Sequence, residues 1–259
     1  MSNFTTWRSL VDGEEILAIP DSAIFHWPFA EGSGSTLSEE LDGQDGAING
    51  PTWTSGSWWD DYALSGDGTD DYVETTTWGG FWEDYANDEF TVLFTFETTD
   101  DFASLIGGRA DGGNNNQRFM LNTGDVGEGS APVSGKLNFQ WAGDESSGAD
   151  YSVVHTEEDV TDGTRYRAAL VVDNDSGRVN ADAVSFALNG SFVEDVTEQD
   201  EANEEFEDIM GNPILFFAHS DEGGDDAAHI DAEIDNIIVT NEGLSESEIQ
   251  DDYDAQPWT

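Results

Sequence analysis

Apolar and polar residues alternate in many short stretches of this chain, and segments rich in Gly, Asn, Asp and Ser separate these stretches. A period of two places one set of side chains on a single face of a β-strand. Each stretch therefore predicts a strand with one buried face. The predicted buried faces are Phe25, Trp27 and Phe29; Phe90, Val92, Phe94 and Phe96; Leu137, Phe139 and Trp141; Tyr166, Ala168, Leu170 and Val172; and Val184, Phe186 and Leu188.

The dipeptide Asn189-Gly190 lies between two such stretches. Both residue types tolerate the positive φ angles of a type I′ turn, so we expect a tight hairpin here. Many strands with almost no helix and no dividing linker favour an all-β fold, with two antiparallel sheets packed as a jelly-roll sandwich. We expect an N-terminal arm or docking segment over residues 1–21 and one domain over residues 22–259.

One helix is marked near the C-terminus. Ser245 followed three residues later by Glu248 is the pattern of a capping box, and Leu244 with Ile249 occupy the positions of a hydrophobic staple. We expect a short helix over residues 246–253 that closes the domain.

The charge of the chain narrows its environment and its partners. Lys plus Arg number 7 against 57 Asp plus Glu, a formal net charge of -50. Such a chain is either disordered or folded for molar salt, where the Debye length falls to ~3 Å. The 9 Trp, 15 Phe and 6 Tyr fall largely in alternating runs and can form a core, which favours a halophilic folded protein. Without a basic surface, nucleic acid and anionic membranes are disfavoured as partners.

The chain contains no Cys, which excludes disulfides and thiolate metal sites. The N-terminal residues lack a basic region, an uninterrupted apolar run and paired arginines, so we expect no export signal. No apolar run approaches the ~20 residues that span a bilayer, so membrane insertion is not expected.

Several segments follow one another in a familiar order. HWPFAEGSG, YALSGDGTDDYVETT, FTVLFTFETT, VSFALNGSFVEDV and AEIDNIIVTNEGLSESEIQDDY resemble successive strands, turns and the closing helix of the laminin-G-like, concanavalin A-like jelly-roll family. The resemblance implies the same sandwich. It leaves the function open, because this fold carries lectins, adhesion modules, virion proteins and glycoside hydrolases.

The segment LVDGEEILAIPDSAIFHWPFAEGSG, an arm followed by the domain, resembles structural proteins of haloarchaeal tailed viruses and their proviruses. This resemblance implies a non-enzymatic, exposed virion component such as a turret, decoration or tail-fibre protein. Such a protein is assembled in the host cytoplasm and released by lysis, which needs no export signal. Its expected partners are other virion proteins, copies of itself and host-surface glycans. The alternative is a lectin-like module of a haloarchaeon.

Three carboxylates alternate along one apolar stretch: Asp231, Glu233 and Asp235. Family 16 glycoside hydrolases, which share the fold, place alternating acids on one strand, but in the order Glu-Asp-Glu. We therefore expect surface acids and no catalytic residue, with a hydrolase using Glu233 and a neighbouring Asp as the alternative. Strict alternation places Asp235 on the face of Ile237 and Val239, so either a bulge turns the strand or Asp235 is partly buried.

Acidic residues on Gly-containing loops suggest a calcium site, because Ca²⁺ takes about 6–8 oxygen ligands. Asp235 is also a candidate calcium ligand, because the corresponding Asp of laminin-G-like domains often contributes to a cation site. The alternative is that these carboxylates only fix turns. Four His residues without zinc-binding spacing are expected to serve packing. The candidate metal ligands are Asp42, Asp67, Asp71 and Asp235, with Asp45 and Asp70 beside them.

Two dense aromatic segments, TWTSGSWWDDY and TTTWGGFWEDY, are predicted to be loops. Exposed aromatic rings on loops can stack on sugar faces and mark an interaction surface. The alternative is that the rings cover the edges of the sandwich or pack against a neighbouring subunit. The candidate ligand-binding residues are Trp53, Trp58, Trp59, Trp78 and Trp82.

Overall fold

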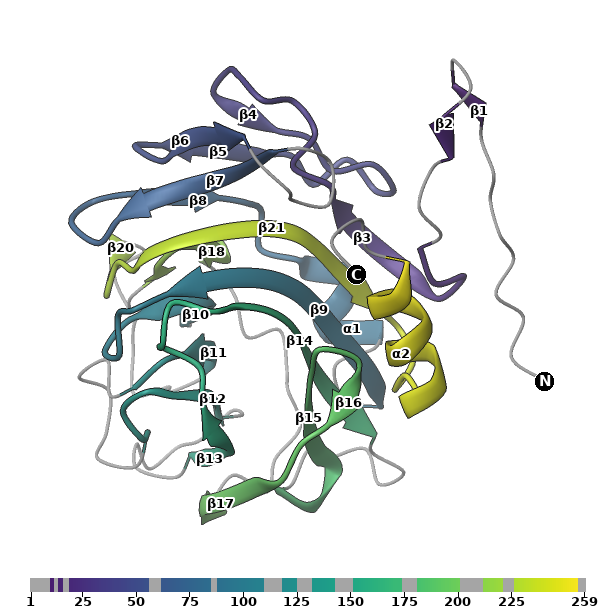
Figure 1. The fold of residues 1–259 in the computed structure, drawn as a ribbon, viewed down its shortest axis with the longest axis vertical. Coiled ribbons are helices and arrows are strands. Elements are labelled where there is room, and N and C mark those ends of the chain that lie inside the picture. The colour runs from purple at the N-terminus through teal and green to yellow at the C-terminus, as the bar shows by residue number, and fades with distance from the viewer. Residues whose placement is uncertain are drawn as a thin grey trace.

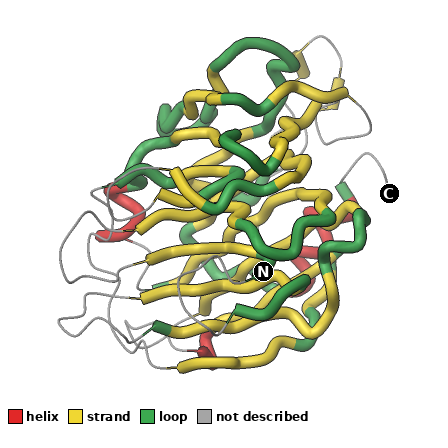
Figure 2. Tube along the Cα trace, turned by 90° about the vertical axis from the view of Figure 1, so that its left-hand side faces the viewer, coloured by secondary structure: helices red, strands yellow, loops and turns green. Residues whose placement is uncertain are grey.

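The protein is a two-layered antiparallel β-sandwich, as the computed structural model shows (Figure 1). Figure 2 shows the strands lying side by side across the molecule, with short helical segments at strand ends. This is the predicted jelly-roll architecture, including the short C-terminal helix. The structure describes residues 10–11, 14–15, 19–55, 62–84, 88–109, 118–124, 132–142, 151–173, 181–200, 212–220 and 226–255.

Within these residues one sheet has nine strands and the other eight. The nine-stranded sheet runs β17 (Asp195–Asp200), β13 (Ser152–Asp159), β12 (Lys136–Ala142), β11 (Arg118–Asn122), β10 (Ser104–Arg109), β18 (Leu215–Phe216), β8 (Tyr72–Glu74), β5 (Gly46–Asn49) and β4 (Thr36–Leu37). The eight-stranded sheet runs β16 (Ser191–Phe192), β15 (Val184–Leu188), β14 (Arg165–Asp173), β9 (Glu89–Thr98), β21 (Asp231–Thr240), β7 (Tyr62–Asp67) and β6 (Thr52–Ser55), with β3 (Ala23–Trp27) paired to the second half of β21.

The remaining elements are short. In the described part of the chain, β1 (Leu10–Val11) pairs with β2 (Glu14–Glu15), and β19 (His219–Ser220) pairs with β20 (Asp226–Ala227). The helical segments are α1 (Gly79–Asp84), η1 (Ala181–Ala183) and α2 (Glu246–Asp254). In Figure 1 the β1–β2 hairpin lies apart from the sandwich. The division into an arm over 1–21 and a domain over 22–259 remains a prediction. No described helix has the length and apolar character to cross a membrane.

The apolar faces predicted from alternation lie in the core between the sheets. On β9, Phe94 and Phe96 are fully buried in this core, whereas Leu93, which precedes Phe94, packs on the opposite side of the sheet. The other four predicted faces also lie in the core, with Tyr166 partly buried at its margin. The period of two therefore identified the buried side of each strand.

The predicted hairpin and helix are both present. Asn189 and Gly190 have φ angles of 51° and 86° and join β15 to β16 in a two-residue turn. At the start of α2 the Glu248 carboxylate accepts hydrogen bonds from the Ser245 backbone N–H (2.8 Å) and hydroxyl (2.7 Å). Leu244 and Ile249 pack in one cluster, as a hydrophobic staple requires.

A bulge in β21 changes which side chains face the core. Ala232 and Ile234 lie in the inter-sheet core, and so do Ile237 and Val239, which strict alternation would place on the other face. The register against β9 shifts between Asp235 and Ile238. Asp235 therefore does not share the face of Ile237 that strict alternation alone would have given it. The bulge that the sequence left as an alternative is present, and Asp235 is also fully buried.

The outer face of the eight-stranded sheet is only partly covered. Helix α2 packs Ile249 against Leu93 and Ile238 on one half of this face. At the margin of the covered half, Arg167 and Asp252 form a bidentate ion pair (Nε to Oδ2 2.8 Å, Nη2 to Oδ1 3.0 Å). Both side chains are almost fully buried. The half of the outer face beyond this pair is where the candidate site lies.

Candidate functional site

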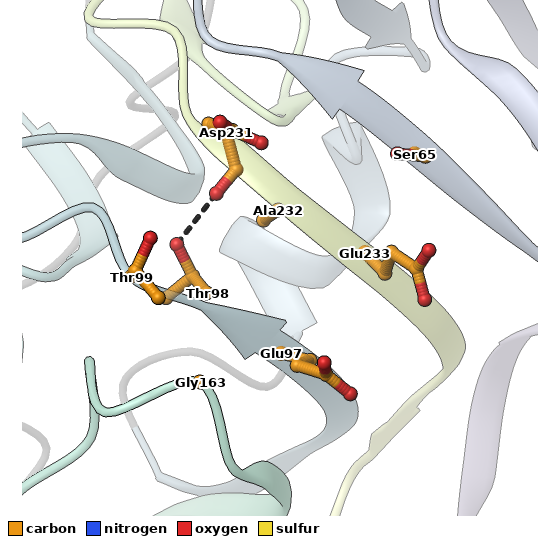
Figure 3. Close-up of a pocket in the computed structure, with 8 residues that line it drawn as sticks. All are labelled: Ser65, Glu97, Thr98, Thr99, Gly163, Asp231, Ala232 and Glu233. Atoms are coloured by element: carbon orange, nitrogen blue, oxygen red, sulfur yellow. Dashed lines mark hydrogen bonds between the residues drawn. The ribbon is translucent and has the colours of Figure 1, made fainter.

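A pocket of about 220 Å³ opens where β9, β21 and β7 run side by side (Figure 3). Ordinary strand alternation directs Glu97 and Glu233 to the outer face, because their neighbours Phe96 and Ile234 lie in the core. In Figure 3 both carboxylates point to the same side of the sheet. We call this the β9–β21 pocket, and it is lined by Ser65, Glu97, Thr98, Thr99, Gly163, Asp231, Ala232 and Glu233.

Strand register brings the charged groups of the pocket together. Glu233 lies directly opposite Glu97 on one side and Ser65 on the other. On the far side of Glu97, Arg165 of β14 is its partner in register, and Arg165 Nη2 is 3.5 Å from Glu97 Oε2. Like charges directly opposite each other in a sheet are unfavourable. Arg165 offsets this repulsion from the Glu97 side.

The environment of Glu233 favours its protonated form. Burial raises the pKa of the Glu233 carboxyl, the Glu97 charge raises this pKa further, and Arg165 lowers it. A carboxyl group that is partly protonated both donates and accepts hydrogen bonds, whereas an ionised one only accepts. The pair therefore offers a ligand several hydrogen-bond acceptors and, at lower pH, a donor.

Hydrogen bonds join the walls of the pocket to each other. The Thr98 hydroxyl donates to the Asp231 carbonyl at 2.6 Å, and the Gly163 N–H donates to the Thr98 carbonyl at 3.0 Å. Gly163 has a φ of +74°, a conformation that favours glycine, in the turn that precedes β14. These bonds fix the positions of the pocket walls without using the Glu97 and Glu233 carboxylates.

An exposed aromatic ring lies on the loop that continues from the pocket. Phe102 is 57% exposed and follows Thr99 by three residues. Asp100 links this loop to the pocket, because its carboxylate accepts from the N–H of Phe102 (3.2 Å) and from the N–H of Asp231 (3.4 Å). The chain that lines the pocket thus continues into a loop with an exposed aromatic ring, although Phe102 itself does not line the pocket.

The aromatic residues proposed as sugar platforms lie elsewhere. Trp78 and Trp82 are fully buried in the core, so their prediction as exposed ligand-binding residues was wrong. The Gly79-Gly80 sequence suggested a loop, but α1 begins there. The Trp82 indole N–H donates to the Thr77 carbonyl at 2.8 Å, and that of Trp78 donates to the Thr75 hydroxyl at 3.1 Å.

The structure describes only part of the other aromatic segment, TWTSGSWWDDY. Trp53 is partly buried against the core, and its indole N–H donates to the Gly34 carbonyl at 3.1 Å. Trp53 therefore makes an internal contact on β6 and does not line the β9–β21 pocket. Trp58 and Trp59 lie outside the described residues.

The structure brings together one part of the predicted metal site. Asp67, Asp70 and Asp71 each place a carboxylate oxygen within 4.8 Å of the others. Asp67 Oδ1 accepts the Thr69 N–H (2.9 Å) and Asp71 Oδ2 accepts the Asp67 N–H (3.0 Å), so both carboxylates already fix the turn. Burial raises the pKa of Asp71, followed in the same direction by the charges of Asp67 and Asp70. A calcium ion at this turn remains a prediction.

Asp42 and Asp235 do not join this cluster, so the structure does not bring the four predicted ligands together. Asp42 lies in the loop between β4 and β5, whereas the Asp71 turn is at the other end of β5. The organiser of the Asp42 loop is Glu39, whose buried carboxylate accepts the backbone N–H groups of His26, Leu41, Asp42 and Gln44. Asp235 lies in a cross-strand row with Thr95 and Arg167.

The three alternating acids of β21 have three different environments. Asp231 is exposed, Glu233 is half-buried in the pocket and Asp235 is fully buried. The prediction of a surface acid is confirmed for Asp231. Sequence alternation correctly grouped the three on one strand but could not find Glu97. The only sequence signal for Glu97 was its position on the polar side of the β9 stretch. The register between β9 and β21 was needed to pair Glu97 with Glu233.

No family model matches the sequence, and the comparison with curated proteins found no match. Solved structures do match. The botulinum neurotoxin serotype C1 binding domain aligns at 12% identity with a TM-score of 0.56, over 89% of this chain and 51% of that chain. A botulinum neurotoxin type C structure, described as showing cell entry dependent on two ganglioside molecules, has 12% identity, a TM-score of 0.58 and coverage of 91% and 51%.

A third match is the Trypanosoma rangeli sialidase in complex with 2,3-difluorosialic acid, at 13% identity, a TM-score of 0.56 and coverage of 94% of this chain and 34% of that chain. This chain spans about half the length of the neurotoxin binding domains and about a third of the sialidase. At these identities the likeness establishes the β-sandwich fold.

Proposed function

We propose that this protein is a non-catalytic carbohydrate-binding β-sandwich domain that works in molar salt. The observation that carries the proposal is the β9–β21 pocket, a depression lined by hydroxyl and carboxylate groups, whose lining residue Thr99 continues into the loop that carries the exposed ring of Phe102. Sugar hydroxyls donate hydrogen bonds to carboxylates. The apolar face of a sugar ring packs on an aromatic side chain, so the two halves of this site suit the two kinds of surface of a sugar.

The fold adds support at the level of ligand class. Two of the matching solved structures are described with gangliosides and with a sialic acid analogue. These structures resemble this chain only in fold. They therefore support carbohydrate as the ligand class but do not indicate which sugar is bound. The pocket residues named here come from this chain alone.

The setting we propose is the surface of a haloarchaeal virus particle. The formal charge of -50 supports a molar-salt environment. A carbohydrate-binding domain on a virion would recognise glycans of the host surface, while its other contacts would be virion proteins and copies of itself. Location on the virion, after assembly in the host cytoplasm and release by lysis, is part of the same proposal. A lectin-like module of the halophile itself would use the same pocket.

Two matched variants test the pocket. Phe102→Ala removes the exposed ring on the loop that follows the pocket residue Thr99, whereas Phe192→Ala removes an exposed ring on β16, at the edge of the sheet. In a glycan array probed in molar KCl, we expect Phe102→Ala to weaken binding about fivefold or more, because an aromatic contact contributes about 1 kcal/mol or more. Phe192→Ala should bind like the unmodified protein. Equal effects of the two variants would place binding outside this pocket.

Glycoside hydrolysis is the second candidate function, and one observation favours it. Opposed residues of antiparallel strands have Cβ atoms about 4.5–5.5 Å apart, close to the ~5–5.5 Å carboxyl spacing of retaining enzymes. Glu97 and Glu233 are such a pair, and the raised pKa of Glu233 suits a general acid. The sequence suggested Asp231 or Asp235 as the second carboxylate of such a site, but the structure places Glu97 opposite Glu233. Failure of the intact protein to cleave any glycan that it binds would remove this candidate.

A further inference from the structure

The β9–β21 pocket has a charge that restricts which sugars it can hold. Its two facing carboxylates, Glu97 and Glu233, belong to neighbouring strands, and Asp231 lies two residues from Glu233 on β21. Among the described residues around the pocket, acids outnumber basic residues, and Arg165 of β14 is the exception. The charged side chains nearest the pocket in sequence are Asp67 on β7, Glu97 on β9, Asp100 after β9, Asp162 beside Gly163, Arg165 on β14, and Asp231 and Glu233 on β21. Glu89, Arg167, Asp173 and Asp235 lie farther along the same strands.

Arg165, the cation nearest the pocket in sequence among these described side chains, does not provide an anion site. Its Nη2 is 3.5 Å from Glu97 Oε2, on the side of Glu97 away from Glu233. Arg165 is not among the residues that line the pocket. An acidic sugar bound here would therefore place its carboxylate beside Glu97 and Glu233 rather than against a guanidinium.

The negative charge of the pocket disfavours bound acidic sugars even in molar salt. Screening to ~3 Å removes long-range repulsion but leaves groups in contact, so an acidic sugar could still approach the pocket. Once bound, its carboxylate would meet the ionised Glu97 and Glu233 carboxylates, which accept hydrogen bonds and cannot donate one to it. A neutral sugar presents hydroxyl donors to the same acceptors and carries no charge to be repelled.

We infer that the β9–β21 pocket binds neutral, hydroxyl-rich sugars and excludes acidic sugars, with the Glu97–Glu233 pair as the specificity determinant. This inference rests on the proposed carbohydrate-binding function. The inferred ligand class differs from the ligand of the matching Trypanosoma rangeli sialidase structure, which is described in complex with 2,3-difluorosialic acid.

The test uses sugars that differ only in charge. Glucose, galactose and mannose are each compared with the corresponding uronic acid, in which a carboxylate replaces the C6 alcohol, by saturation-transfer NMR titration in molar KCl. We expect at least one hexose to bind about tenfold or more tightly than its uronic acid, because like charges in contact strongly disfavour the acidic partner. Equal or tighter binding of the uronic acids would overturn the inference.

Two variants tie the selectivity to the pocket. Glu233→Gln removes one charge and supplies an amide donor, so it should narrow the difference between hexose and uronic acid. Glu74→Gln, an exposed acid on β8, should leave the difference unchanged. Hexose binding that is insensitive to both Glu233→Gln and Phe102→Ala would refute the inference while carbohydrate binding itself stood. Absence of binding to every sugar and to a glycan array would overturn the proposed function and the inference together.

A pH titration gives an independent readout. The raised pKa of Glu233 means that its carboxyl gains a proton, and with it a donor, before most exposed acids do so as pH falls. Uronic acid binding to the unmodified protein should therefore recover on mild acidification, and Glu233→Gln should lack this recovery. An unchanged preference across the titration of Glu233 would count against the pair as the determinant.

Discussion

At the scale of single residues, the carboxyl group of Glu233 links the pocket to stability. Because folding raises its pKa, the folded state binds more protons than the unfolded state between the ordinary and the raised value. Stability therefore falls as pH rises through this window, and the loss persists above it. We expect Glu233→Gln to be more stable than the unmodified protein above the window and about equal to it below.

The gain should not exceed about 1 kcal/mol, because Glu233 is only half-buried and water and salt screen its repulsion from Glu97. Thermal unfolding at two pH values in one molar salt buffer measures it, with the exposed-site variant Glu74→Gln as the neutral control. A loss of stability in Glu233→Gln at neutral pH would show that the ionised carboxylate is held by favourable contacts.

At the scale of elements, a buried ion pair holds helix α2 on the sheet. Arg167 donates two hydrogen bonds to Asp252, and its third nitrogen, Nη1, donates to the Asn236 carbonyl at the β21 bulge (2.6 Å). Asp252→Asn leaves the guanidinium buried beside a neutral group, which costs about 3–5 kcal/mol. Chemical unfolding should show this loss of stability at every salt concentration, because the ion pair is buried away from the solvent and its ions.

The neighbouring Asp251 on α2 is exposed, and Asp251→Asn is the matched control, with an expected change within about 0.5 kcal/mol. If the two variants unfold alike, the ion pair does not anchor α2. A loss in Asp252→Asn that disappears in molar salt would mean that the pair is open to solvent.

The turn of the β15–β16 hairpin also contacts α2. A Cβ on Gly190, whose φ is +86°, would lie 2.9 Å from Gln250 Nε2 and 3.0 Å from Tyr253 Cβ. Gly43 has a φ of +73°, and a Cβ there would meet no atom within 4 Å, so Gly43→Ala adds only backbone strain of about 1–2 kcal/mol. Gly190→Ala should show a larger drop in Tm than Gly43→Ala, and equal drops would show that α2 yields to the added methyl group.

These elements also show what the sequence could and could not predict. Alternation identified the buried faces, and the Asn189-Gly190 turn and the Ser245 capping box were local signals, because short-range geometry determines them. The pairing of Glu97 with Glu233 depends on register between strands far apart in sequence, which no local pattern contains. The burial of Trp78 and Trp82 was not predicted, because the segment around them was expected to be a loop. A helix begins there instead, at Gly79, and both indole rings lie in the core.

At the scale of the whole molecule, charge should make stability depend on salt. A formal charge of -50 repels itself within a compact fold, and raising the salt from 0.1 M to 1 M shortens the Debye length from ~10 Å to ~3 Å. We expect Tm, followed by circular dichroism, to rise steeply over this range and the chain to lose its near-ultraviolet signal reversibly at low salt. A Tm independent of salt would contradict the halophilic interpretation.

The most direct test of the central claim is saturable binding of the purified, labelled protein to haloarchaeal cell envelopes in molar salt, with and without removal of their glycans. Carbohydrate recognition through the β9–β21 pocket predicts saturable binding that glycan removal abolishes and that Phe102→Ala weakens while Phe192→Ala does not. No saturable binding, or binding that survives glycan removal, would contradict the account and leave the protein a purely structural component.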